Sequence, residues 1–369
     1  MRLRALAALA LAALLVWVAP LAGLAFAGHP VAAYLHFPPR TSIVAQPPFA
    51  WSLFLAFCVP AYFALALFCA ALGRALPAQR VAAAARFPWW GWLGVVLVAA
   101  GWKLAWSEAL APAWLGQTFS VLWIGYILVV NGLLWRRTGA SLLTHRTRCF
   151  VALFVVSAGF WWLFEHLNQF VRNWYYGGVG AANDLDYFVR ATLPFATVLP
   201  AVASTWEWLR QQPRVEAMDL PAVGGDPLLA WLAAMLGVVA LAAIGLYPDF
   251  LFPVLWVAPV LVFAGVQHIV AGETVFSALA RGDWRPVLQP ALAALVCGFF
   301  WELWNYGSAA KWHYAIPYVQ RFSLFEMPLL GYLGYLPFGI QCAIVIDLVA
   351  RIVEGRVPNF HLPKRQTRR

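Results

Sequence analysis

Long apolar stretches alternate with short polar segments along the whole chain. Ten of these stretches are long enough for a membrane-spanning helix, which needs about 20 mostly apolar residues. They cover residues 5–27, 48–73, 88–111, 113–135, 149–171, 190–209, 228–247, 250–271, 286–306 and 325–350. The pattern therefore predicts an all-α fold, a polytopic bundle of about ten transmembrane helices.

The composition excludes most other classes of protein. Of the 369 residues, 63% are hydrophobic and 11% are charged, whereas soluble domains carry about 25% charged residues. So few charges cannot cover a water-facing surface, and they also argue against a disordered chain. The five cysteines lie within or at the ends of apolar stretches, so they indicate no disulfide framework.

The basic residues mark one side of the membrane. With a cytoplasmic N-terminus, 19 of the 25 lysines and arginines fall in the predicted inner segments and five in the outer ones. This positive-inside asymmetry predicts a multi-pass membrane protein with both termini in the cytoplasm. The net charge of +10 thus reports orientation rather than nucleic-acid binding, and we expect the basic tail to face anionic lipid.

The first apolar stretch, residues 5–27, has a second interpretation. Arg2 and Arg4, the apolar run and the closing Ala25-Phe26-Ala27 also resemble a cleavable signal peptide. The run exceeds the usual signal-peptide core of about 7–15 residues, so we favour a retained helix. Cleavage would leave the orientation of the other spans unchanged.

One motif occurs twice. Each copy has a glutamate, an asparagine three residues later, and then a tryptophan and a tyrosine separated by one residue. The members are Glu165, Asn168, Trp174 and Tyr176 in one copy and Glu302, Asn305, Trp312 and Tyr314 in the other. Upstream, Phe119 and Trp123 match Phe252 and Trp256, and Thr138 and Ser141 match Thr274 and Ser277.

These matches predict a domain organisation. Residues 88–210 and 227–350 read as two parallel copies of a four-helix unit, related by a pseudo-two-fold axis along the membrane normal. We refer to them as the first half and the second half. The remaining segments are an N-terminal two-helix module (1–87), a cytoplasmic linker (211–226) and a basic cytoplasmic tail (351–369).

The duplicated glutamates are the candidate catalytic residues. Ionisable groups at membrane depth are costly and usually have a function, so Glu302 and Glu165 are expected to serve as proton donor and acceptor. Asn168 and Asn305 share their helix faces and are expected to orient them. The alternative is that each glutamate only caps or braces its own half.

Aromatic residues complete the candidate binding site. Trp174, Tyr176, Trp312 and Tyr314 fall in outer loops, where they form either an aromatic belt at the membrane interface or an apolar lid over a lipid-like ligand.

The last apolar stretch is interrupted by proline and glycine, which points to a binding site. Its Tyr332 and Tyr335 are expected to line a cavity, and Glu326 to begin the helix, where a carboxylate is also a favourable cap. The alternative is the packing of an ordinary kinked helix. The histidines show no regular ligand spacing, so we expect no metal ion and no cofactor.

The second half also resembles known proteins. Its Glu302 motif and the run from Phe325 to Tyr335 resemble an uncharacterised family of bacterial integral membrane proteins, which implies no activity. The same stretch is weakly similar to the small membrane lycopene cyclases. Their paired glutamates, which would protonate a polyene, are absent, and this absence argues against cyclisation. The matching positions are Trp301, Glu302, Trp312, Tyr314, Gly334, Tyr335 and Pro337, and Phe338 and Gly339 replace the paired glutamates.

Three functions are compatible with these features. The first is an enzyme or binding protein for a membrane-dissolved isoprenoid or lipid. The second is a transporter or proton-coupled carrier, and the third is a non-catalytic scaffold. Transporters usually bind near the midplane, whereas the polar groups here gather at the outer edge, which favours the first. The sequence leaves open whether the chain is an enzyme and what its oligomeric state is.

Overall fold

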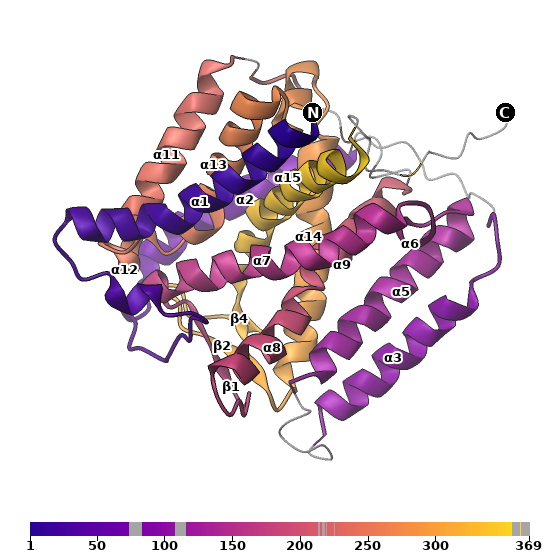
Figure 1. Cartoon of the computed structure of the whole chain (residues 1–369), viewed down its shortest axis with the longest axis horizontal. Coiled ribbons are helices and arrows are strands. Elements are labelled where there is room, and N and C mark those ends of the chain that lie inside the picture. The colour runs from indigo at the N-terminus through magenta and orange to yellow at the C-terminus, as the bar shows by residue number, and fades with distance from the viewer. Residues whose placement is uncertain are drawn as a thin grey trace.

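Apolar helices build nearly all of the structure (Figure 1). This computed structural model describes residues 1–73, 83–107, 116–212, 215, 218, 220–224, 226–355 and 362. The helices are α1 (Arg2–Phe26), η1 (Ala32–Leu35), α2 (Trp51–Gly73), α3 (Trp89–Ala105), α5 (Thr118–Thr138), α6 (Leu142–His145), α7 (Thr147–Val171), α8 (Asp184–Phe195), α9 (Val198–Arg210), α11 (Leu228–Ile244), α12 (Pro248–Leu251), α13 (Val254–Ala271), η2 (Val275–Arg281), α14 (Arg285–Tyr306), η3 (Leu329–Gly334) and α15 (Tyr335–Glu354). Four short strands interrupt them: β1 (Trp174–Gly177), β2 (Lys311–Tyr314), β3 (Ser323–Leu324) and β4 (Met327–Pro328).

The helices confirm a polytopic membrane protein. In the described part of the chain, eight helical segments are long and apolar enough to cross a membrane. Two further predicted spans correspond to shorter apolar helices, α3 and α11, of 17 residues each. By length the described residues therefore contain eight candidate spans, where the sequence predicts about ten.

Two helix pairs flank a central group. In Figure 1, α3 and α5 lie on one side and α11 and α13 on the other, with α7, α9, α14 and α15 between them. Glycine permits the close approach within each pair. A Cβ on Gly94 of α3 would lie 2.7 Å from the carbonyl oxygen of Gly125 on α5, and one on Gly237 of α11 would lie 2.9 Å from that of Ala258 on α13. Helix α1 packs across α11, α13 and α15.

The loops meet in two separate groups. Among the predicted inner segments, Arg146 forms an ion pair with Glu354 at 2.7 Å, and the backbone N–H of Leu220 donates to the carbonyl of Gly282. Among the predicted outer segments, the N–H of Ala50 donates to the carbonyl of Tyr318. Segments far apart in the chain therefore contact one another within each predicted group.

The predicted span 190–209 is two helices, not one. Phe195 ends α8 and Val198 begins α9. The hydroxyl of Ser157, on α7, bridges the break: it donates to the carbonyl of Phe195 at 2.6 Å and accepts from the N–H of Leu199 at 3.0 Å. The hydroxyl thus takes the place of the helical bond from the Leu199 N–H to the Phe195 carbonyl. Pro200, which follows, has no N–H to continue the helical bonds across the break.

The predicted span 325–350 also starts differently. Residues 323–328 form the hairpin β3–β4, and η3 precedes α15. Glu326 therefore lies in the hairpin turn and not at the beginning of a helix, because Pro328 and the strand pairing hold this segment extended. Pro337 is tolerated in the first turn of α15, where its missing N–H has no helical partner.

Parts of four predicted segments lie outside the described residues. They are residues 74–82 of the N-terminal module, residues 108–115 of the first half, residues 213, 214, 216, 217, 219 and 225 of the linker, and residues 356–361 and 363–369 of the basic tail.

Candidate functional site

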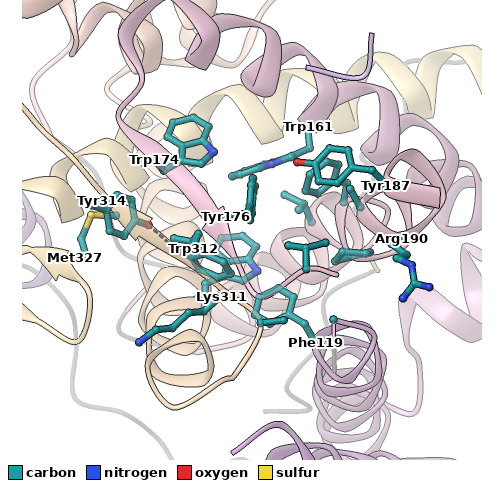
Figure 2. Close-up of a pocket in the computed structure, with 18 of the residues that line it drawn as sticks. Phe119, Trp161, Trp174, Tyr176, Tyr187, Arg190, Lys311, Trp312, Tyr314 and Met327 are labelled. Carbon is teal, nitrogen blue, oxygen red and sulfur yellow. Dashed lines mark hydrogen bonds between the residues drawn. The ribbon is translucent and has the colours of Figure 1, made fainter. Parts of the chain in front are cut away.

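A cavity of about 130 Å³ opens among residues of both halves (Figure 2). This volume is close to that of a cavity of about 150 Å³ that binds benzene. It therefore suits a small ring or one end of an apolar chain, not a whole lipid. Aromatic side chains make up much of its lining: Phe119, Trp161, Trp174, Tyr176, Tyr187, Phe195, Trp256, Trp301, Trp312, Tyr314 and Tyr335.

A two-stranded ribbon joins the two halves at this cavity. Strand β1 of the first half pairs antiparallel with β2 of the second half. The register places Trp174 opposite Tyr314 and Tyr176 opposite Trp312, so each duplicated tryptophan faces the tyrosine of the other copy. The four duplicated aromatic residues therefore lie together in the cavity wall. Trp174 is 3% exposed, so it does not belong to an aromatic belt facing lipid headgroups.

The duplicated asparagines hold the two strands in the same way. The side-chain amide of Asn168 donates to the carbonyl of Trp174 at 2.8 Å and its oxygen accepts from the Trp174 N–H at 3.3 Å. Asn305 makes the equivalent bonds with Trp312, at 2.8 and 2.9 Å. Asn168 in addition accepts from the N–H of Asn173 and donates to the hydroxyl of Thr41. The bonds that the two asparagines share go to the strand backbone, so any shared effect on the glutamates passes through the ribbon.

Glu165 is buried behind strand β1, on the side of the aromatic cavity lining that faces away from the cavity. Its Oε1 accepts three hydrogen bonds, from the indole N–H of Trp161 at 2.9 Å, from that of Trp174 at 3.1 Å and from the hydroxyl of Tyr176 at 2.6 Å. All three donors line the cavity, whereas Glu165 does not. The carboxylate therefore ties strand β1, through Trp174 and Tyr176, to helix α7, which carries both Glu165 and Trp161.

Glu302 has the same place in the second half but different partners. Its Oε1 accepts from the hydroxyls of Tyr314 at 2.6 Å and Tyr335 at 2.8 Å. Tyr335 reaches it because Gly298, one turn earlier on α14, leaves room for the ring: a Cβ there would lie 2.5 Å from it. The indole N–H of Trp312 donates to the hydroxyl of Tyr314 at 2.8 Å.

The two carboxylates are therefore not equivalent. Glu165 accepts three hydrogen bonds from cavity-lining side chains and Glu302 accepts two. The second oxygen of Glu302, Oε2, is buried without a hydrogen-bond partner. Neither glutamate is among the residues that line the cavity. The duplicated motif thus places two similar carboxylates in unlike environments.

The strand tyrosines remain neutral donors. Burial raises the pKa of the Tyr176 hydroxyl well above its ordinary value, and the adjacent Glu165 raises it further. Burial and Glu302 do the same to the pKa of Tyr314. Because both shifts disfavour the charged phenolate, the two hydroxyls keep donating to the carboxylates across the physiological pH range.

Two other predicted residues lie apart from the cavity. Glu326 binds Lys311 at 2.5 Å and lies 3.6 Å from His313, both on β2. Tyr332, in η3, stacks near Tyr335 with ring centroids 5.9 Å apart, but its hydroxyl donates to the carbonyl of Leu324. Of these predicted binding residues, Tyr335 alone lines the cavity.

Several cavity residues are not among those predicted. Trp161 lies one turn before Glu165, and Trp301 immediately before Glu302, so both are visible once the motif is extended backwards. On α8, Tyr187, Ala191 and Phe195 recur every four residues and form its buried face, a helical spacing that sequence inspection can recognise.

No group of three or more metal-binding side chains occurs within the described ranges. His166 is buried and stacks on Trp17 with ring centroids 4.0 Å apart, and its Nε2 lies 2.9 Å from the carbonyl of that residue.

Comparisons with protein families, curated proteins and solved structures find no match. The geometry of the chain itself is therefore the basis for assigning a function.

Proposed function

We propose that this membrane protein binds one end of a membrane-dissolved isoprenoid or lipid in the aromatic cavity. The cavity itself is the observation that carries this proposal. Its indole and phenol rings offer a large apolar surface. The side-chain N–H or O–H groups of five lining residues already donate hydrogen bonds to Glu165 or Glu302, namely those of Trp161, Trp174, Tyr176, Tyr314 and Tyr335. Such a site favours the burial of an apolar group and gives a polar solute few hydrogen-bond partners.

Binding explains the glutamates better than acid–base chemistry does. A general acid or base must lie within hydrogen-bond reach of its substrate, and the described geometry puts Tyr176, Tyr314 and Tyr335 between the cavity and the carboxylates. In this proposal Glu165 and Glu302 fix the rings that contact the ligand.

A scaffold is the second candidate. It is favoured by the three bonds that Glu165 receives, since all of them come from the chain's own side chains. Under this interpretation the carboxylates brace the two halves and no ligand is required.

We also propose that the two halves are duplicated units. The support is the equivalent pair of bonds by which Asn168 holds Trp174 and Asn305 holds Trp312, together with the symmetric strand register. In this proposal the ligand site is the junction between the two copies, as in other proteins built from parallel repeats.

The membrane location of the protein and its family are also proposals. The distribution of basic residues supports an inner bacterial membrane with cytoplasmic termini, and a basic tail that contacts anionic lipid. The resemblance to the bacterial membrane family and to the lycopene cyclases rests on the sequence motif alone. Four residues of that motif, Trp301, Trp312, Tyr314 and Tyr335, also line the cavity.

A filled-cavity variant tests the binding proposal. Ala191 lines the cavity on α8, whereas Val189, on the same helix, is 50% exposed. We expect the purified protein to carry an enriched lipid or isoprenoid, detected by mass spectrometry of its extract. Ala191→Phe should lose that molecule and Val189→Phe should retain it.

The outcome that contradicts binding is equally clear. If no molecule is enriched over the bulk lipid of the host membrane, or if Ala191→Phe retains it at the wild-type level, the cavity is not its site. The scaffold interpretation would then be preferred.

A further inference from the structure

One tyrosine hydroxyl of the cavity differs from the others in its bonding. Among the described residues of the lining, four are tyrosines: Tyr176, Tyr187, Tyr314 and Tyr335. The hydroxyls of Tyr176, Tyr314 and Tyr335 donate to the two buried glutamates at 2.6 to 2.8 Å. The hydroxyl of Tyr187 forms no hydrogen bond with any other described residue. Tyr187 therefore keeps a donor that the described part of the chain does not use.

This hydroxyl belongs to a buried side chain of the cavity wall. Tyr187 lies on the face of α8 that also carries Ala191 and Phe195, and all three residues line the cavity. It is 6% exposed, and Figure 2 shows its hydroxyl directed toward Trp161, another residue of the lining. Since a buried donor without an acceptor is costly, the position indicates an acceptor that comes from outside the chain.

The ring of Tyr187 is held on more than one side. The guanidinium group of Arg40 lies 4.6 Å from the ring centroid, and the ring of Trp162 lies edge-on with its centroid 6.4 Å away. Arg40 is itself held by an ion pair of 2.9 Å with Asp184, the first residue of α8. The donor is therefore positioned before a ligand arrives, which lowers the entropy cost of binding.

The rest of the lining restricts the chemistry of the acceptor. Among the described residues that line the cavity, none is an aspartate or a glutamate. A ligand hydroxyl would bring a donor of its own, and a buried donor needs an acceptor. A carbonyl oxygen needs only a donor, which the Tyr187 hydroxyl supplies. A neutral carbonyl also avoids the cost of taking an anion out of water into an aromatic cavity.

We propose that the ligand carries a carbonyl group on the segment that enters the cavity, and that the Tyr187 hydroxyl donates to its oxygen. The proposal rests on the binding function proposed above and adds the chemical class of the ligand. The cavity of about 130 Å³ suits a single ring. A ring ketone or quinone at the end of an isoprenoid chain therefore has the chemistry that this site recognises.

Three probes of one skeleton test the carbonyl. Acetophenone carries a C=O group, 1-phenylethanol replaces it by a hydroxyl, and α-methylstyrene replaces the oxygen by a CH₂ group of similar shape. Binding to the detergent-solubilised full-length protein is measured by equilibrium dialysis, with protein-free micelles as the reference for partitioning. After this correction we expect the wild type to bind acetophenone more tightly than either of the other two probes.

Tyr187→Phe removes the hydroxyl and keeps the ring. It should weaken acetophenone by about fivefold, the effect of one neutral hydrogen bond, and leave α-methylstyrene unchanged. Tyr175→Phe is the matched control, because the Tyr175 hydroxyl also has no hydrogen bond with a described residue, but Tyr175 stacks on His313 and does not line the cavity. Its affinity for all three probes should equal that of the wild type.

A second measurement needs no variant of the site. The C=O stretching band of acetophenone bound to the wild type should lie at a lower frequency than in protein-free micelles, because a hydrogen bond to the oxygen weakens the C=O bond. An unshifted infrared band would overturn the assignment of Tyr187 as donor.

The remaining outcomes separate this proposal from the binding function. An unchanged affinity for acetophenone in Tyr187→Phe, or an equal loss of acetophenone and α-methylstyrene, would overturn the carbonyl assignment and keep the cavity as an apolar site. Equal binding of 1-phenylethanol and acetophenone would overturn the choice of a carbonyl. Ala191→Phe should remove the binding of all three probes. If it does not, or if no probe binds, the binding function itself fails.

Discussion

Removing the two glutamates one at a time tests the asymmetry between the halves. Glu165→Ala leaves three donors without an acceptor, the indole N–H groups of Trp161 and Trp174 and the hydroxyl of Tyr176. Glu302→Ala leaves two, the hydroxyls of Tyr314 and Tyr335. The two changes are otherwise well matched, because both remove one fully buried carboxylate from a central helix.

The magnitude depends on the number of orphaned donors. A buried donor that loses its partner costs about 1–3 kcal/mol. Glu165→Ala should therefore destabilise the protein by about 3–9 kcal/mol and Glu302→Ala by about 2–6 kcal/mol. The more informative quantity is the difference between the destabilisation by Glu165→Ala and that by Glu302→Ala, about 1–3 kcal/mol, because errors common to both sites cancel.

Glutamine variants separate the hydrogen bonds from the charge. Glu165→Gln and Glu302→Gln each keep one acceptor oxygen, so both should lie between the wild type and the alanine variant of the same site. The assay is thermal unfolding of the purified protein in one detergent, followed by the loss of its monodisperse chromatographic peak. All variants are compared at the same heating rate, since unfolding of membrane proteins is often irreversible.

A specific ranking of the variants would refute this account. If Glu302→Ala lowers the unfolding temperature as much as Glu165→Ala or more, the number of donors does not set the cost. If both alanine variants match the wild type, the carboxylates do not brace the cavity at all.

Individual contacts support three further predictions. Asn168 and Asn305 each bond to the backbone of one strand of the β1–β2 ribbon. Asn168→Ala and Asn305→Ala should therefore each give faster amide exchange in both β1 and β2. Faster exchange in one strand alone would contradict this prediction. Gly339→Val should prevent the close packing of α15 on α14 and lower expression of folded protein, since even a Cβ would lie 2.2 Å from the carbonyl oxygen of Pro290; normal expression would contradict it. Although burial alone would raise the pKa of the Asp283 carboxyl, its hydrogen bonds with Arg285 and the positive charge of that residue lower it. A carboxyl whose pKa is lower in the folded than in the unfolded state stabilises the folded state at pH values above its unfolded-state pKa, and this contribution is lost as the pH falls through its folded-state pKa. Asp283→Asn should therefore reduce the loss of folding stability at acid pH. An unchanged dependence of stability on pH would contradict this prediction.

The sequence predicts the membrane class and the approximate positions of most of the long apolar helices because burial in lipid acts on long apolar runs. It also identifies the duplicated motif, since Glu165 and Glu302 keep the same neighbours. It does not reveal that β1 and β2 pair, because two four-residue strands far apart in the chain have no local signal. The break between α8 and α9 is missed for a similar reason, since its partner, Ser157, lies on another helix.

The matching of capping residues shows how spacing can mislead. The sequence aligns Thr138 and Ser141 with Thr274 and Ser277. In the structure, the capping box that resembles that of Thr274 and Ser277 is formed by Ser141 and Thr144. The hydroxyl of Thr138 instead donates to the carbonyl of Leu134 at the end of α5. Serine and threonine serve both purposes, so their identity alone does not tell which one applies.

The ribbon has a consequence for how the molecule is made. Strand β1 leaves the ribosome long before β2, and its partner is synthesised only after α11, α13 and α14. Until then β1 has an open edge, and the wall that Trp174 and Tyr176 help to build is incomplete. The cavity is thus among the last parts to form during biogenesis, and a chain truncated before β2 would be inserted in the membrane without it.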